Sequence, residues 1–313
     1  MSYTVRIKDE IASIDCTKSE MIAELSGFIR NNGTLSDGTI ILTTENVKTK
    51  ERIEYFLREA YEVSSIVEIK DSLNFSKKDL YVININDKVD LILKDIGYTD
   101  NDGNNLSTPP TYIVGANEEI RSYLRGVFLS CGSINDPKTS RYHMELLIYY
   151  PEEAIFVQKL LNIFDLNAKI LNRDKGYMIY IKEADKISDY LKLLGATKAV
   201  LYFEEVRVYR NQKNKANRLN NCEQANMDKV FATAVEQLSQ IDIIERTGSL
   251  DLLDERTQVA LEFRKKYPES SLKELSEIIT VETGKPLTKS GLAHRLRKIK
   301  ELAERLKKQE SNK

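Results

Sequence analysis

The side chains with the clearest chemical potential lie near the C-terminal end of the chain, where basic and hydroxyl groups are closely spaced. Such groups hydrogen-bond to the phosphate oxygens of DNA, and some of them recognise base edges in the major groove. The candidates for contact with double-stranded DNA are Thr288, Lys289, Ser290, His294, Arg295, Arg297, Lys298 and Lys300. Base contacts are expected from Lys289, Ser290, His294 and Arg297, and phosphate contacts from Arg295, Lys298 and Lys300.

Two predicted helices must hold these groups. Ser271 and Glu274 form a capping box that begins a short helix. A turn containing Gly284 and Pro286 interrupts the pattern, and Thr288 can cap a longer, basic helix. This order over about 271–308 is typical of a helix-turn-helix, whose second helix enters the major groove. The alternative is a helical bundle with a solvated basic face.

Charge is distributed unevenly along the 313 residues. Residues 1–206 hold 25 lysines and arginines against 32 aspartates and glutamates, whereas residues 207–313 hold 22 against 16. The net charges are therefore −7 and +6. An acidic body with a basic end favours a polyanionic partner for the end alone, although a solvated basic tail would have the same composition.

A polar segment separates the two parts. Residues 207–223 are predicted to be a basic linker that offers further DNA contacts, followed by a helical DNA-binding domain over residues 224–313, with a long helix from about Gln224 to Ile244. The basic side chains of the linker are Arg207, Arg210, Lys213, Lys215 and Arg218.

A glycine-bearing motif occurs twice in the first 206 residues. Gly27 and Gly33 recur as Gly126 and Gly132, each pair 99 residues apart. Each copy ends a stretch with apolar residues at helical spacing. The inner glycine of each copy is expected to let two helix backbones approach closely, as small residues do at helix contacts. The outer one is expected to adopt a positive φ at a helix C-terminus.

The surroundings of the motif repeat as well, over residues 15–100 and 111–200. Each repeat has the pattern helix, strands, helix, hairpin, helix. Because hairpin connections outnumber crossovers, we expect an α+β domain with antiparallel sheets over residues 1–206, followed by an all-α domain.

Other chemistry has little support in the sequence. Cys16, Cys131 and Cys222 are odd in number and far apart, which is typical of a reducing cytoplasm. The two histidines belong to no cluster with zinc-ligand spacing, and neither a phosphate-binding loop nor a dinucleotide-binding pattern is present. We expect no cofactor, no bound metal and no membrane segment, since no apolar run approaches the ~18 residues that a span requires.

The paired glycine motif resembles that of the LAGLIDADG homing endonucleases. Together with the stretch Leu287–Leu296 and its helix-turn-helix, the chain resembles the bacterial WhiA family over nearly its whole length. That resemblance implies a two-repeat LAGLIDADG-like domain joined to a DNA-binding domain. It also implies a transcription regulator involved in cell division, chromosome segregation and sporulation, and hence a cytoplasmic protein associated with the nucleoid.

One departure from the nuclease pattern bears on activity. The nucleases carry a metal-binding carboxylate just before each closing glycine, where this chain has Asn32 and Cys131. Neither offers the anionic oxygen that Mg²⁺ prefers. We therefore expect no enzymatic activity, and a role in protein or ligand interaction for the first domain. The alternatives are a metal-dependent endonuclease that uses acids outside the motif, and a scaffold whose basic end contacts acidic proteins.

Overall fold

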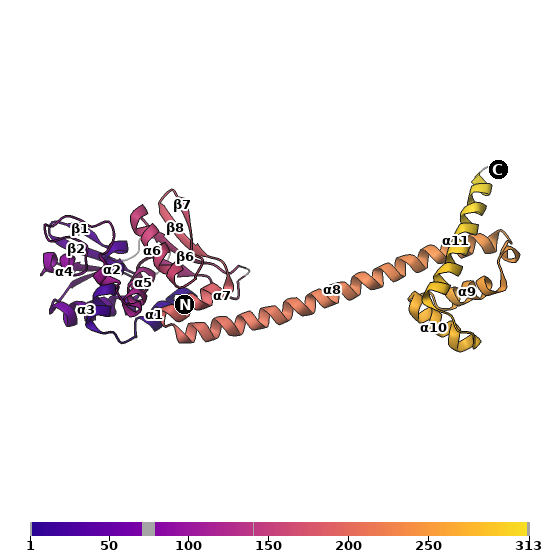
Figure 1. Ribbon diagram of the computed structural model, residues 1–313, viewed down its shortest axis with the longest axis horizontal. Coiled ribbons are helices and arrows are strands. Elements are labelled where there is room, and N and C mark those ends of the chain that lie inside the picture. The colour runs from indigo at the N-terminus through magenta and orange to yellow at the C-terminus, as the bar shows by residue number, and fades with distance from the viewer. Residues whose placement is uncertain (1, 71–78, 140, 312–313) are drawn as a thin grey trace. The chain divides into compact units, whose positions relative to one another are not determined.

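The computed structural model describes residues 2–70, 79–139 and 141–311. Its contacts divide the chain into two compact units, Met1–Asn211 and Gln212–Lys313. Each unit has its own hydrophobic core. Figure 1 shows that helix α8 (Thr197–Arg246) is continuous through the point of division, so it contributes to both units.

Two copies of one arrangement make up most of the first unit. The first copy contains α2 (Lys18–Asn32), β1 (Thr34–Ser36), β2 (Thr39–Thr44), α3 (Val47–Tyr61), β3 (Ile66–Lys70), β4 (Leu80–Ile85) and α4 (Val89–Asp95). After a short 3₁₀ helix, η1 (Thr111–Ile113), the second contains α5 (Asn117–Cys131), β5 (Gly132–Ile134), β6 (Met144–Ile148), α6 (Pro151–Ile163), β7 (Lys169–Arg173), β8 (Gly176–Ile181) and α7 (Ala184–Leu194). The predicted duplicated α+β fold is confirmed.

Each copy has one four-stranded antiparallel sheet. The strand orders are β1-β2-β4-β3 and β5-β6-β8-β7, so the two sheets share one topology. Leu42 lies opposite Ile83 in the first sheet, and Leu146 lies opposite Ile179 in the second. All four side chains are fully buried, because alternate residues of a strand point to the same face and that face meets the helices.

Helices α2 and α5 pack side by side at the centre of the unit, as the inner glycines predict (Figure 1). A Cβ added to Gly27 would overlap the carbonyl oxygen of Tyr123, and one added to Gly126 would overlap that of Glu24. Both obstacles are backbone atoms of the opposite helix. Only glycine therefore allows this separation of the two helices.

The expectation for the closing glycines is wrong. Gly33 and Gly132 have φ angles of −72° and −86°, which any residue can adopt. Their lack of a side chain has a different reason. A Cβ on Gly33 would lie 2.6 Å from the carbonyl oxygen of Ile29, and one on Gly132 would overlap the ring of Phe128. Space, rather than backbone conformation, requires glycine at both positions.

Helix α1 (Tyr3–Ile11) packs into the first unit and connects it to the start of α8. Tyr3, Ile7 and Ile11 follow one another at a spacing of four and are buried. The carboxylate of Glu10 accepts hydrogen bonds from the backbone N–H groups of Lys198 and Ala199, at 2.6 and 3.0 Å. Since those groups lack partners within a helix, α1 caps the start of α8.

Helix α8 starts 27 residues before the expected Gln224 and includes all of residues 207–223. The segment lacks a regular apolar stripe because its side chains from Asn211 to Lys229 are exposed. Hydrophobic periodicity could not reveal a helix without a buried face. Its composition is nevertheless compatible with helix, because it contains neither proline nor glycine.

Over its described residues, 212–311, the second unit contains helices and no strand. After the end of α8 it contains η2 (Leu250–Leu252), α9 (Glu255–Lys266), α10 (Leu272–Thr283) and α11 (Lys289–Ser311). The predicted apolar face of α11 is confirmed, since Leu292, Leu296, Ile299 and Ala303 are buried. They pack with Leu275 and Ile279 of α10 and with residues of α8 and α9 in a single core.

Candidate nucleic-acid interface

Helices α10 and α11 are joined as a helix-turn-helix requires. The capping box is present, because the side chain of Ser271 accepts the N–H of Glu274 while the carboxylate of Glu274 accepts that of Ser271. Gly284 ends α10 with a φ of +67°, a conformation that favours glycine. Thr288 Oγ1 accepts the N–H of Gly291 at 3.1 Å and so caps α11.

Four expected base-reading residues of α11 are exposed: Lys289, Ser290, His294 and Arg297. At about 100° per residue, Ser290, His294 and Arg297 fall within roughly 60° of one another, on the side opposite the buried leucines. Among the residues that the structure describes, the side chains of Lys289, His294 and Arg297 have no hydrogen-bond or ion-pair partner. This face of α11 is therefore available to a ligand.

The three expected phosphate contacts are placed differently. Lys298 pairs with Asp254 at 2.9 Å and Lys300 with Glu236 at 2.8 Å. Arg295 donates to the carbonyl oxygen of Arg256 at 3.1 Å. These groups connect α11 to the start of α9 and to α8. Exposed ion pairs are weak because water screens them, so a phosphate could replace these partners.

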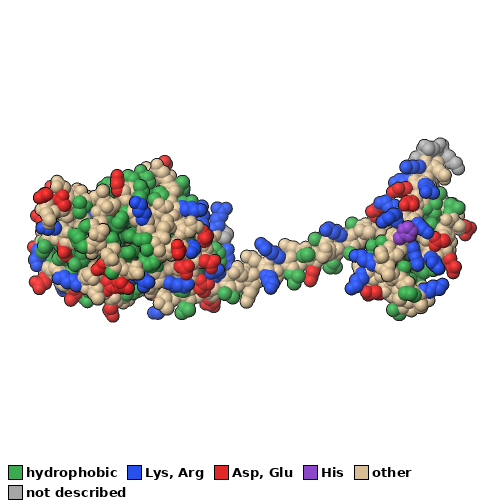
Figure 2. Space-filling model, viewed as in Figure 1, with side chains coloured by type: hydrophobic (Ala, Val, Ile, Leu, Met, Phe, Trp, Pro, Cys, Tyr) green, Lys and Arg blue, Asp and Glu red, His purple; other side chains and the backbone are tan. Residues whose placement is uncertain are grey.

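The linker residues divide into two groups. Arg207 pairs with Asp185 and with Glu204, and Arg210 donates to the carbonyl oxygens of Pro137 and Thr139, each at 2.7 Å. Both arginines therefore hold α8 to the first unit. The remaining basic residues form no ion pair with any described residue, and they are exposed: Lys213, Lys215 and Arg218. Figure 2 shows basic side chains along this exposed part of α8.

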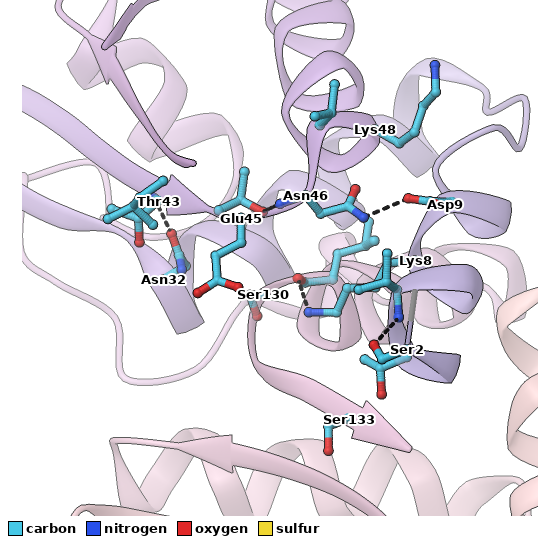
Figure 3. A pocket seen from close by; sticks show the side chains of 16 residues that line it. Ser2, Lys8, Asp9, Asn32, Thr43, Glu45, Asn46, Lys48, Ser130 and Ser133 are labelled. Atoms are coloured by element: carbon cyan, nitrogen blue, oxygen red, sulfur yellow. Dashed lines mark hydrogen bonds between the residues drawn. The ribbon is translucent and has the colours of Figure 1, made fainter. Parts of the chain in front are cut away.

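The base of the central helix pair is the position where a nuclease would carry its carboxylates. A cleft of about 900 Å³ opens there, lined by Asn32 and Ser130 (Figure 3). Asn32 Oδ1 accepts a hydrogen bond from the backbone N–H of Thr43 at 2.7 Å, so the side-chain amide is already bonded to β2. Cys131 is not among the lining residues. Burial raises the pKa of its thiol to about 11, so the sulfur is protonated at neutral pH.

Lys8 is a residue of this cleft that the sequence did not single out. Its ammonium group donates to the carbonyl oxygen of Leu129, near the end of α5, at 2.8 Å (Figure 3). Burial lowers the pKa of Lys8 to about 8. Two carboxylates, Asp9 and Glu45, also line the cleft. No group of three or more potential metal-binding side chains occurs among residues 2–70, 79–139 and 141–311.

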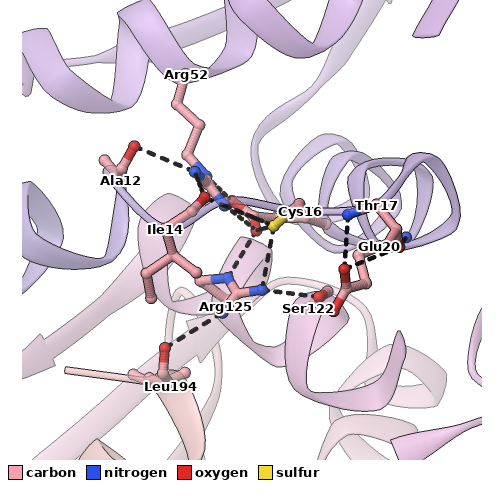
Figure 4. A network of polar contacts seen from close by, with 10 residues as sticks. Ala12, Ile14, Cys16, Thr17, Glu20, Arg52, Ser122, Arg125 and Leu194 are labelled. Atoms are coloured by element: carbon pink, nitrogen blue, oxygen red, sulfur yellow. Dashed lines mark hydrogen bonds and ion pairs between the residues drawn. The ribbon is translucent and has the colours of Figure 1, made fainter. Parts of the chain in front are cut away.

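A second polar cluster lies inside the first unit, between α2, α3 and α5 (Figure 4). The carboxylate of Glu24 pairs with Arg52 at 2.5 Å and with Arg125 at 2.7 Å. All three side chains are buried. Cys16 lies beside both guanidinium groups, but burial and the Glu24 charge raise its pKa. Because the raised pKa keeps the thiol protonated at neutral pH and the Glu24 carboxylate is already paired with both guanidinium groups, the cluster has a structural role.

Comparison with known proteins matches most of the chain to one family. Three family models match in succession: the WhiA N-terminal LAGLIDADG-like domain over residues 18–98, the WhiA LAGLIDADG-like domain over 120–213, and the WhiA C-terminal HTH domain over 216–303. A relative from Exiguobacterium sibiricum, named "Probable cell division protein WhiA", is 38% identical over 99% of this chain and 98% of its own. The chain belongs to the WhiA family.

Further WhiA proteins support the same alignment. One from Staphylococcus haemolyticus, with the same name, is 39% identical over 98% of both chains. The crystal structure of full-length DUF199/WhiA from Thermatoga maritima has a TM-score of 0.60 and 22% identity, and the match covers 97% of this chain and 99% of that one. This likeness shows that the WhiA fold is shared.

Within residues 2–70, 79–139 and 141–311, no helix of this WhiA chain combines the length and the apolar composition that crossing a bilayer demands.

Proposed function

We propose that this chain is a non-enzymatic, DNA-binding transcription regulator connected with cell division. The observation that carries the proposal is the exposed face of α11, where His294 and Arg297 have no partner among the described residues and Ser290 lies beside them on the second helix of a helix-turn-helix. The relatives' name supports the connection with division. Chromosome segregation, sporulation and a cytoplasmic location on the nucleoid are the further parts of the proposal, and they rest on the family resemblance.

The first unit is proposed to bind a protein or a small ligand and to cleave nothing. Asn32 already hydrogen-bonds β2, and Cys131 is a protonated thiol outside the cleft, so the two motif positions offer no pair of metal-binding carboxylates. The net charge of −7 over residues 1–206 would repel a DNA backbone. The alternative, a nuclease that uses other acids, would have to rely on groups such as Asp9 and Glu45.

Binding of duplex DNA by the intact chain is the first expected result. In a mobility-shift titration, the logarithm of the affinity should fall linearly with the logarithm of salt concentration, by roughly 0.9 for each phosphate neutralised. A chain that ends at Asn211 should not bind. Failure of the intact chain to bind at low salt would refute the DNA-binding function. Nicking of plasmid DNA with Mg²⁺ or Mn²⁺ would instead favour the nuclease alternative.

Base reading by α11 gives a second expected result. Arg297→Ala should change the preference among DNA sequences, because a good base contact contributes about 1–3 kcal/mol of discrimination. Lys298→Ala is the matched control, since it removes one charge from the next position of the same helix. It should weaken all sequences to a similar extent. Equal effects of the two variants on sequence preference would mean that another face of α11 meets the bases.

A further inference from the structure

A small cationic cavity lies within the second unit, where α8 passes the first turns of α10 and α11. Its volume is about 220 Å³. Four basic residues contribute to its wall: Lys229, Arg264, Lys273 and Lys289. The other lining residues are Val230, Thr233, Ser270, Ser271 and Leu272. No carboxylate is among these described lining residues, so the positive charge is not balanced within the cavity.

Arg264 shows most clearly that a counter-charge is missing. The residue is only 2% exposed, yet no described carboxylate forms an ion pair with it. Its Nη1 donates to the carbonyl oxygen of Ser270 at 2.7 Å, which orders the turn before α10. Its buried Nε atom has no hydrogen-bond partner. Burial of a charge without an ionic partner is costly, which here lowers the pKa of the guanidinium group.

The start of α10 adds a second attraction for anions. The first N–H groups of a helix have no acceptor within it, and the helix dipole places partial positive charge there. Ser271, Leu272 and Lys273, which begin this helix, all line the cavity. The nearby carboxylate of Glu274 accepts the N–H of Ser271 and lines a different groove. A helix N-terminus is a typical phosphate-binding position, and here three lysines line the same cavity.

We propose that this cavity holds a phosphate group, supplied by the backbone of the bound DNA. The proposal rests on the DNA-binding function proposed above. Lys289 connects the cavity with the base-reading face of α11, because it begins α11 and also lines the cavity. A phosphate held between α8, α10 and α11 would fix the position of α11 in the groove. The buried guanidinium of Arg264 would then gain the negative charge that no described residue provides.

Removal of the two exposed lysines tests the proposal without disturbing the core. Lys229 and Lys273 form no ion pair with any described residue. Lys229→Gln with Lys273→Gln in the intact chain should reduce the salt slope of DNA binding by about 0.9, the effect of one phosphate. Two control substitutions in the C-terminal part of α11, Arg305→Gln and Lys308→Gln, remove the same charge. Lys308 lies 19 residues beyond Lys289, roughly 28 Å along α11. The control should keep the original slope.

A second measurement tests whether the cavity binds a phosphate of the DNA backbone or a free phosphate ion. The melting of the second unit is followed in inorganic phosphate and in chloride at equal ionic strength. If phosphate raises the melting temperature of the unmodified chain but not that of the lysine double variant, while the DNA slope is unchanged, the cavity binds a free phosphate group instead. This arm remains decisive even if the intact chain binds no DNA. A double variant that melts normally in chloride and matches the unmodified chain in both measurements would overturn the proposal.

Discussion

Gly126→Leu is expected to destabilise the first unit by about 3 kcal/mol. This value is the upper end of the usual cost of overpacking a core. The new Cβ would overlap the backbone carbonyl oxygen of Glu24 on α2, which cannot rotate away as a side chain can. Helices α2 and α5 must therefore separate. In calorimetry, the transition of the first unit should fall by roughly 6–12 °C, since 1 kcal/mol shifts a unit of this size by about 2–4 °C.

Two comparisons make this result specific. Glu118→Leu places the same side chain on the exposed start of α5, and it should change the melting temperature little. The second unit has a separate core, so its transition should be unchanged in both variants. Equal melting of the Gly126→Leu and Glu118→Leu chains would contradict the close contact between the central helices.

Glu24→Gln is expected to have an effect of similar or larger size. The carboxylate is the shared partner of Arg52 and Arg125, and all three side chains are at most 7% exposed. Its removal would leave two buried guanidinium groups without a counter-charge. Breaking a buried ion pair by removing one partner typically costs about 3–5 kcal/mol. The midpoint of chemical denaturation of the first unit should therefore fall sharply.

The matched control for this variant is Glu51→Gln. Glu51 also pairs with one basic residue, Lys48, at 2.8 Å, but both side chains are about half exposed. Water screens such a pair, so its loss should lower the midpoint of chemical denaturation only slightly. If Glu24→Gln were as mild as Glu51→Gln, the cluster between α2, α3 and α5 would contribute little to stability.

Local sequence patterns determined much of the architecture. The two copies of the glycine motif, 99 residues apart, predicted the duplication and the close helix pair. The capping box at Ser271 and the apolar spacing of α11 predicted both helices of the helix-turn-helix. These features depend on residues a few positions apart, within one helix or one strand. Their physical causes, capping and amphipathic burial, can therefore be recognised without knowledge of distant contacts.

Other features were decided only by the tertiary structure. The predicted linker is part of α8, because an exposed helix needs no apolar stripe. Gly33 and Gly132 lack side chains for reasons of space, which depend on the packing of Ile29 and Phe128 around them. The ammonium group of Lys8 reaches α5 across 121 positions of the chain.

Charge pairing likewise depends on contacts between distant segments. Arg125 meets Glu24 across 101 positions, whereas Arg264 finds no carboxylate among the described residues. The sequence alone presents both as ordinary arginines. Whether a charged group is neutralised, exposed or left to attract a ligand is set by the side chains that folding brings around it. Electrostatic energy depends on distance in space and on burial. Composition and spacing along the chain therefore cannot identify those neighbours.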